Sequence, residues 1–362
     1  MFFKKNKKPG GCISILLVIC LLCIGCSPQE AAPEVAGDVG VSKDLIKVGF
    51  SQLGAESDWR QANTESIKEA FTREAGFQLI FEDAGQKQAN QTMAIRRFIQ
   101  QGVDYIAVAP ATEVGWENVL AEAKEAGIPV ILVDRMIEVK DKSLYTCWIG
   151  SDFRLEADKV ISWMEQYFKL HDINQKKLRI AHLQGSIGAS AQIGRTEGLK
   201  AAVKKNNWKV VATEDGDFTQ AKGREVMAGI LYEHSDVNVI YCENDNMAMG
   251  AIEAIEAAGR KAGKNIENGE IMVVSFDGVS KEAMQLLWEG KIACIGECYP
   301  AHGPKLRAAI DVLETGKKPD KLSFVSEGIY SADSSITQVS AAGKDYPVTI
   351  ITDNWIRDRL ND

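Results

Sequence analysis

Residues 46–60 read IKVGFSQLGAESDWR, an apolar run that ends in a polar loop and then enters a helix. Three more short apolar runs follow at 78–83, 105–109 and 130–133, and the segments between them place apolar residues three and four apart. This alternation predicts strands and amphipathic helices in turn. Such βαβ repetition implies a parallel sheet with helices on both faces and right-handed crossovers. We therefore expect a first α/β domain that begins near Asp44.

The same rhythm restarts after Asp152. Further strands are expected near 179–183, 209–213, 237–242, 271–275 and 292–297. The prediction is an α/β protein of two doubly wound parallel-sheet lobes joined by a three-crossing hinge, with lobe 1 at 44–150 plus 298–328 and lobe 2 at 151–297 plus 329–362. In the tail, 346–351 is expected as a last strand and 355–360 as a short helix.

Length and composition are those of an ordinary globular protein of two domains. The chain has 362 residues, of which 45% are hydrophobic and 25% charged, and its net charge is −8. Four lysines that count toward this net charge precede a predicted cleavage site, so the net charge of the mature chain is more negative. This charge argues against binding to a nucleic-acid backbone.

The N-terminus is typical of a secretion signal. Four lysines precede an uncharged apolar run at 13–24, which is too short to span a bilayer comfortably. Gly25 before Cys26 resembles a bacterial lipobox, although Cys23 stands where leucine is usual. We expect a lipoprotein signal peptide at 1–25, lipidation of Cys26, a flexible tether at 26–43 and an extracytoplasmic location on the cell membrane. Cleavage by an ordinary signal peptidase, which would release a soluble protein, stays open.

Four cysteines, Cys147, Cys242, Cys294 and Cys298, fall in the folded part. They lack the paired spacing of a metal site and are interpreted as small core residues, so no metal is expected. An extracytoplasmic disulfide among them is left open, with its partners undetermined.

In open parallel sheets ligands bind beyond the carboxyl ends of the strands, and those positions are polar here. Ser51 ends the first strand, and Trp59 with Arg60 opens the following helix. Asp134 and Arg135 follow the fourth strand and offer an acceptor beside a fixed donor fork. The alternatives to a ligand-binding role are interlobe packing for Trp59, exposure to solvent for Arg60, and a solvated or structural ion pair for Asp134 and Arg135.

The second half offers a similar set of strand-end residues. They are Arg195 after a glycine-containing loop, Phe218, Asn244, Asp277 and Glu297. The loop at 184–190 lacks both the P-loop Lys-Ser/Thr and the GxGxxG pattern, so no nucleotide or other cofactor is expected. The four histidines are scattered and no serine sits in GxSxG, so no catalytic residue is predicted. A glycosidase using paired carboxylates is the enzymatic alternative, and a poorer one.

These residues, in this order, resemble the periplasmic-binding-protein type I family, ribose/galactose branch, from about residue 44 to 330. The likeness is carried by VGFSQLGAESDWRQAN, FEDAGQKQANQ, QGVDYIAVAP, DRMIEVKDKSLY, LQGSIGASAQIGR, GDFTQAKGREVM, ENDNMAMGAI and SFDGV, and it is greatest to the galactofuranose-binding members. It implies a monosaccharide ligand, a hexose in furanose form, held between two lobes and delivered to the permease subunits of an ABC importer.

The resemblance also implies roles for single residues. Trp59 would stack on the sugar and Phe218 would complete a sandwich around its ring. Arg60, Asp134 and Arg135 would contact hydroxyls from the first lobe, and Arg195, Asn244 and Asp277 from the second. Ile193 and Glu297 replace the arginine and glutamine of ribose binders, and both departures speak against ribose.

Two relatives with the same lobes remain as functional alternatives. A transcriptional repressor would need a basic DNA-binding headpiece, whereas this chain has a secretion leader in that place. A sugar-sensing receptor for a membrane histidine kinase or chemoreceptor is not separated from a transport receptor by the sequence. A monomer is expected in either case.

Overall fold

The computed structural model describes residues 45–361, with side chains through Arg357. The predicted signal peptide, Cys26, the tether and Asp44 lie outside the described residues. Both sheets discussed below belong to one contact unit of the chain.

The first sheet has six strands, all paired in parallel. Their order is β11 (Leu322–Phe324), β5 (Cys147–Gly150), β4 (Val130–Val133), β3 (Tyr105–Val108), β1 (Ile46–Gln52) and β2 (Phe77–Asp83). The central strands are buried on both sides, so their residues are almost continuously apolar. Both faces of this sheet must therefore be covered.

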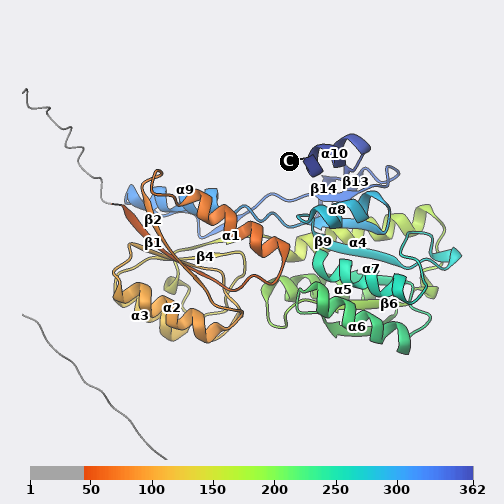
Figure 1. Cartoon of the computed structure of the whole chain (residues 1–362), viewed down its shortest axis with the longest axis horizontal. Helices are drawn as coiled ribbons and strands as arrows, with labels where there is room; N and C mark the ends of the chain where they lie inside the picture. Colours follow the sequence, from red (N-terminus) through yellow and green to blue (C-terminus); the bar gives the residue numbers. More distant parts are fainter. Residues whose placement is uncertain (1–44, 362) are drawn as a thin grey trace, which may run out of the picture. The chain divides into compact units, whose positions relative to one another are not determined.

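Helices cover the two faces of the first sheet, as Figure 1 shows. Helices α1 (Asp58–Ala70) and α9 (Gly303–Glu314) lie on one face, and α2 (Gln88–Gln100) and α3 (Glu117–Glu125) on the other. Alternate residues of one strand enter different cores: Ile131 packs on the α1 side, and Leu132 on the α2 side.

The second sheet has seven strands. Their order is β15 (Thr349–Ile350), β12 (Ile329–Ser331), β10 (Ile292–Glu297), β9 (Met272–Asp277), β8 (Val239–Cys242), β6 (Ile180–Gln184) and β7 (Val210–Asp215). Strand β12 runs antiparallel to β10, and the other pairs are parallel. The carboxyl ends of β6, β8, β9 and β10 therefore share one edge of the sheet.

Two cores cover the second sheet. One contains α4 (Phe153–Leu170) and α5 (Ser190–Asn206); the other contains α6 (Gln220–Glu233), α7 (Asp245–Ala257), α8 (Lys281–Trp288) and α10 (Asp353–Asn361). The antiparallel hairpin of β13 (Gln338–Ala341) and β14 (Lys344–Pro347) packs on α4. Single 3₁₀ turns lie at Lys142–Leu144, Gln175–Lys177 and Ile266–Asn268.

Within the described residues the chain passes between the sheets three times. It leaves β5 for α4 near Ser151, leaves β10 for α9 near Cys298, and leaves β11 for β12 near Glu327. The predicted α/β class, with parallel sheets and a three-crossing connection, is confirmed.

The tail differs from its predicted form. The single strand expected at 346–351 is two strands in different sheets, because β14 ends at Pro347, which has no N–H to extend a ladder. The short helix expected at 355–360 is present as α10. Strands β5, β11 and β12 were not expected: each has only three or four residues, and runs of that length carry little periodic signal.

All four cysteines of the folded part are buried and free, so the disulfide left open from the sequence is not formed. Cys147, Cys242 and Cys294 lie on strands within the cores, as small apolar residues would. Among the described helices, none is both long and apolar enough to cross a membrane.

Candidate functional site

A cavity lies where strand ends of the two sheets face each other. Its lining residues are Glu56, Ser57, Trp59, Arg60, Asp134, Arg135, Phe153, Ala191, Arg195, Phe218, Asn244, Asp277 and Cys298. Eight of the ten residues predicted from the sequence are thus brought together.

On the side of the first sheet, one arginine joins two carboxylates. The N-cap Ser57 begins α1 and accepts a hydrogen bond from the Arg60 amide, which places Arg60 on the first turn. The Arg60 Nη2 lies 2.6 Å from the Asp134 Oδ2, and its Nε lies 3.1 Å from the Glu56 Oε1. All three side chains are nearly inaccessible to solvent, so these are strong, charge-assisted contacts.

Arg135 brings a second cation beside the first. Its Nη2 lies 3.7 Å from the Glu56 Oε1, and its Nη1 donates to the Ala111 carbonyl at 3.1 Å. Burial, followed by repulsion from Arg60, lowers the pKa of Arg135. Burial also works against the charged form of Arg60, but Asp134 and Glu56 outweigh it and its pKa is raised. Because the ordinary pKa of arginine lies far above neutral pH, both guanidinium groups are charged at pH 7.

Glu56 has an unused acceptor in the cavity. Its Oε2 is buried and has no hydrogen-bond partner among the described residues, while Oε1 contacts Arg60. A buried carboxylate oxygen without a donor is costly. The site therefore favours a ligand that carries hydroxyl or amine donors.

On the side of the second sheet, Arg195 holds a similar position on α5. Its Nε donates to the Glu156 Oε2 at 2.9 Å, and its Nη2 lies 3.3 Å from the Asp277 Oδ1. Burial opposes the charge of Arg195, yet the carboxylates of Glu156 and Asp277 outweigh it and raise its pKa well above the ordinary value. Burial raises the pKa of Asp277 well above its usual range.

Aromatic rings line the cavity between these charges. Trp59 donates its ring N–H to the Cys298 carbonyl at 2.8 Å, which fixes the indole, and the Arg60 guanidinium lies 4.7 Å from its ring centroid. The Arg135 guanidinium lies 5.5 Å from the ring centroid of Phe218. Flat apolar surfaces beside carboxylates and guanidinium groups suit a ring with an apolar face and hydroxyl edges.

Three residues that line this cavity have a left-handed backbone conformation. Asp134, Phe218 and Asp277 all line it and all have positive φ, at 65°, 58° and 102°. Phe218 in particular has a bulky side chain that rarely adopts this region. Such strain gathers at functional sites, where the surrounding fold over-determines the conformation.

Two predicted site residues do not reach the cavity. The buried Ser51 lies behind it on β1, where its carbonyl accepts from the Ala109 amide. Glu297 ends β10, and its carboxylate accepts hydrogen bonds from the Gly328 amide and the Tyr330 hydroxyl. The last strand-end position therefore points toward β12, a strand that the sequence did not reveal.

Asn244 lines the cavity and also caps α7, because its side-chain oxygen accepts a hydrogen bond from the Met247 amide.

Five lining residues were not predicted: Glu56, Ser57, Phe153, Ala191 and Cys298. Glu56 carried a usable signal, because it stands four residues before Arg60, the spacing of a helical ion pair. Phe153 and Cys298 lie at chain crossings, and nothing in the sequence places a crossing beside a cavity.

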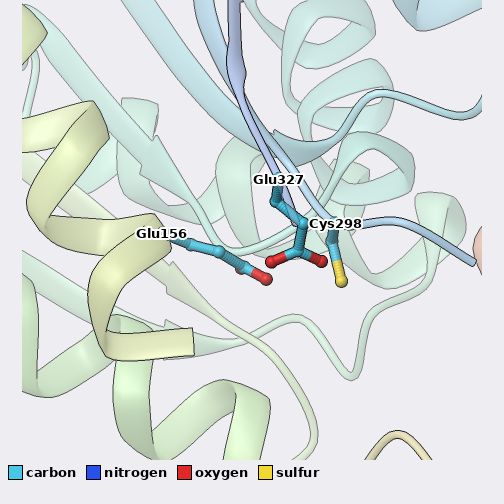
Figure 2. A group of neighbouring side chains, drawn as sticks. All are labelled: Glu156, Cys298 and Glu327. Atoms are coloured by element: carbon cyan, nitrogen blue, oxygen red, sulfur yellow. The ribbon is translucent and has the colours of Figure 1, made fainter. Parts of the chain in front are cut away.

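One described cluster has donor atoms of the kind that bind metals. A carboxylate oxygen of Glu156, one of Glu327 and the Cys298 sulfur all lie within 4.8 Å of one another (Figure 2). Glu156 already pairs with Arg195, and Glu327 accepts from Ser151 and Tyr299. Because each carboxylate already has a protein partner on one of its oxygens and the buried Arg195 supplies a cation beside them, we assign no metal to the cluster.

Known proteins match this chain over most of its length. The model of the periplasmic binding protein domain matches residues 48–297. The chain belongs to this family. The galactofuranose-binding protein YtfQ of Escherichia coli is 39% identical over 295 residues, which are 80% of this chain and 89% of that protein.

Solved structures agree with this assignment. A Mycobacterium smegmatis protein in complex with β-D-fucofuranose is 40% identical, with a TM-score of 0.74 over 79% of this chain and 91% of that one. The arabinose-transporter component of Shewanella sp. ANA-3, bound to L-arabinofuranose, is 40% identical, with a TM-score of 0.71 over 78% and 91%. The family consists of transporter binding proteins, so the expectation of a receptor rather than an enzyme is confirmed.

Proposed function

We propose that this protein is the sugar-binding receptor of an ABC importer and that it captures a monosaccharide in furanose form in the cavity. The observation that carries the proposal is the cavity itself, where buried carboxylates and guanidinium groups alternate around Trp59 and Phe218. The relatives at 38–40% identity that are named for galactofuranose or were solved with fucofuranose or arabinofuranose support the furanose form.

We propose that the two sheets are the cores of two lobes, divided as the sequence predicted, and that they close over the sugar. Contacts already join them across the cavity: the Asp58 amide donates to the Asn246 side chain at 3.1 Å, and the Met136 amide to the Ser190 hydroxyl at 3.0 Å. Sugar held by both sides would add to these contacts and shift the population toward the closed form, which would dock on the permease.

We also propose that the mature protein is a monomer attached to the outer face of the membrane through lipid on Cys26. The support is the leader pattern in the sequence, since these residues lie outside the described part of the chain.

Leader-free protein is expected to melt at a higher temperature with the right sugar. A ligand at a hundredfold its Kd adds about 2.7 kcal/mol to the free energy of unfolding. We expect shifts with D-galactose, L-arabinose or D-fucose and a smaller one with ribose. The ring form is tested with the matched pair methyl β-D-galactofuranoside and methyl β-D-galactopyranoside, of which only the first should bind. A shift with the pyranoside alone would reject the furanose assignment, and no shift with any sugar would reject the function.

The substitution Gly185→Ala is expected to weaken sugar binding by at least about tenfold without removing any polar group. A Cβ at this position would lie 1.9 Å from the Phe218 Cζ, so the ring must move. The control is Gly229→Ala on α6, whose Cβ meets nothing within 4 Å and which should bind normally. Calorimetric titration measures both, and normal affinity in Gly185→Ala would show that the Phe218 ring is not needed.

A further inference from the structure

The three chain crossings meet at one carboxyl group. The Ser151 hydroxyl donates to the Glu327 Oε1 at 2.5 Å, and the Tyr299 amide donates to the same oxygen at 2.8 Å. These donors belong to the first and second crossings, and Glu327 belongs to the third. One side chain therefore ties all three connections between the sheets.

A second carboxyl group faces the first. Figure 2 shows Glu156, on α4, directing its carboxylate toward that of Glu327, with the Cys298 sulfur beside them. The Glu156 Oε2 is paired with Arg195, whereas its Oε1 is buried and has no hydrogen-bond partner. Glu156 is buried and Glu327 half-buried, and their carboxylate oxygens lie within 4.8 Å of each other, so the charge of one opposes ionisation of the other and favours a proton on one of them.

The arrangement of neighbours places that proton on Glu327. Glu156 contacts the buried Arg195, which favours its anion. Lys159 directs its ammonium to the carbonyls of Glu327 and Gly328 and not to the Glu327 carboxylate. Burial, with the charge of Glu156 second, raises the pKa of Glu327 to about 9. The titratable and charged groups around the cluster are Asp152, Glu156, Lys159, Arg195, Asp277, Glu297, Cys298 and Tyr346.

We propose that Glu327 is a positioning residue of the ligand site: as a neutral acid it joins the three crossings and donates its proton toward the free oxygen of Glu156. Glu156 is thereby held against Arg195, which lines the cavity. The proton on Glu327 therefore stabilises both the three chain crossings and the Glu156–Arg195 pair beside the cavity. This inference rests on the proposed function, because it takes Arg195 as a ligand-binding group.

Calorimetric titration with D-galactose between pH 6 and 10 tests the link to binding. Glu327→Ala is expected to raise Kd at pH 7 by at least about tenfold, and Glu327→Gln, which keeps a neutral group of the same shape, to restore it to within about threefold of wild type. Wild-type affinity should fall above pH 8 as Glu327 loses its proton, whereas Glu327→Gln should show no such fall.

Melting of the ligand-free protein tests the proton without any sugar. Because the folded-state pKa of about 9 lies above the ordinary 4.5, the folded state keeps a proton that the unfolded chain releases, and stability falls as pH rises through that window. Glu327→Gln should lose several degrees less of Tm than wild type between pH 5 and 9. Glu225→Gln, an exposed carboxyl on α6, is the charge control and should follow the wild-type slope.

The outcomes separate the two proposals. The role of Glu327 would be overturned if Glu327→Gln and Glu327→Ala lost equal sugar affinity. It would also be overturned if the Tm of Glu327→Gln changed with pH as much as that of wild type. In another outcome, wild type fails to bind D-galactose while the melting curves behave as described. That result would support the protonated Glu327 and would reject both D-galactose as the ligand and the link between Glu327 and sugar binding.

Discussion

Replacement of Arg195 by alanine is expected to abolish sugar binding and to lower the free energy of unfolding by about 3–5 kcal/mol. The Arg195 side chain is 2% exposed and pairs with Glu156 and Asp277, which are 0% and 7% exposed. Its removal leaves two buried carboxylates without their cation. Urea unfolding measures the stability, and titration calorimetry measures the binding.

The pH dependence of Arg195→Ala has a definite sign. Burial already raises the pKa of Glu156 and of Asp277, and losing Arg195 removes the charge that opposes this. The orphaned carboxyls can take up protons at low pH, so the destabilisation should be smaller at pH 5 than at pH 8. The control is Arg97→Ala, a surface pair with Glu82 in which the arginine is 46% exposed; it should cost about 1 kcal/mol or less. A loss of that size in Arg195→Ala would contradict the buried ion-pair network.

Replacement of Asp134 is the second large effect. Asp134→Ala is expected to weaken sugar binding by at least about a hundredfold, because it leaves Arg60, a buried cation, with only Glu56 as counter-charge. The backbone adds to this loss, since φ at 65° suits aspartate or asparagine better than alanine.

Asp134→Asn separates the charge from the backbone. Asparagine keeps the shape and tolerates the left-handed conformation, so its melting temperature should lie between those of wild type and Asp134→Ala while its affinity stays low. Calorimetry and thermal melting of the three proteins make the comparison. Wild-type affinity in Asp134→Asn would show that the carboxylate charge is not part of the ligand site.

Prediction succeeded where the local pattern carries the information. The strand Val130–Val133 was located at its observed bounds, because four buried apolar residues followed by Asp134 and Arg135 mark a strand end. Eight predicted residues converge on the cavity, because parallel strands present their carboxyl ends at one edge and the helices that carry Trp59, Arg60 and Arg195 follow such strand ends. Glu297 is the exception among the strand ends, since the unpredicted β12 lies beside it, and its carboxylate accepts hydrogen bonds from Tyr330 on that strand and from Gly328 just before it.

The amino-acid sequence by itself determined the α/β class, the alternation that builds two parallel sheets, and most of the polar groups at their edges. Periodicity and strand-end chemistry are local properties, so they can be read from the sequence without knowledge of the packing. Only the tertiary structure decided which charges pair, because Arg195, Glu156 and Asp277 are far apart in sequence and meet through the packing of α4 and α5 and the end of β9. The same holds for the hinge carboxyls: Glu156 and Glu327 are far apart in sequence, and only the fold brings their carboxylates within 4.8 Å of each other.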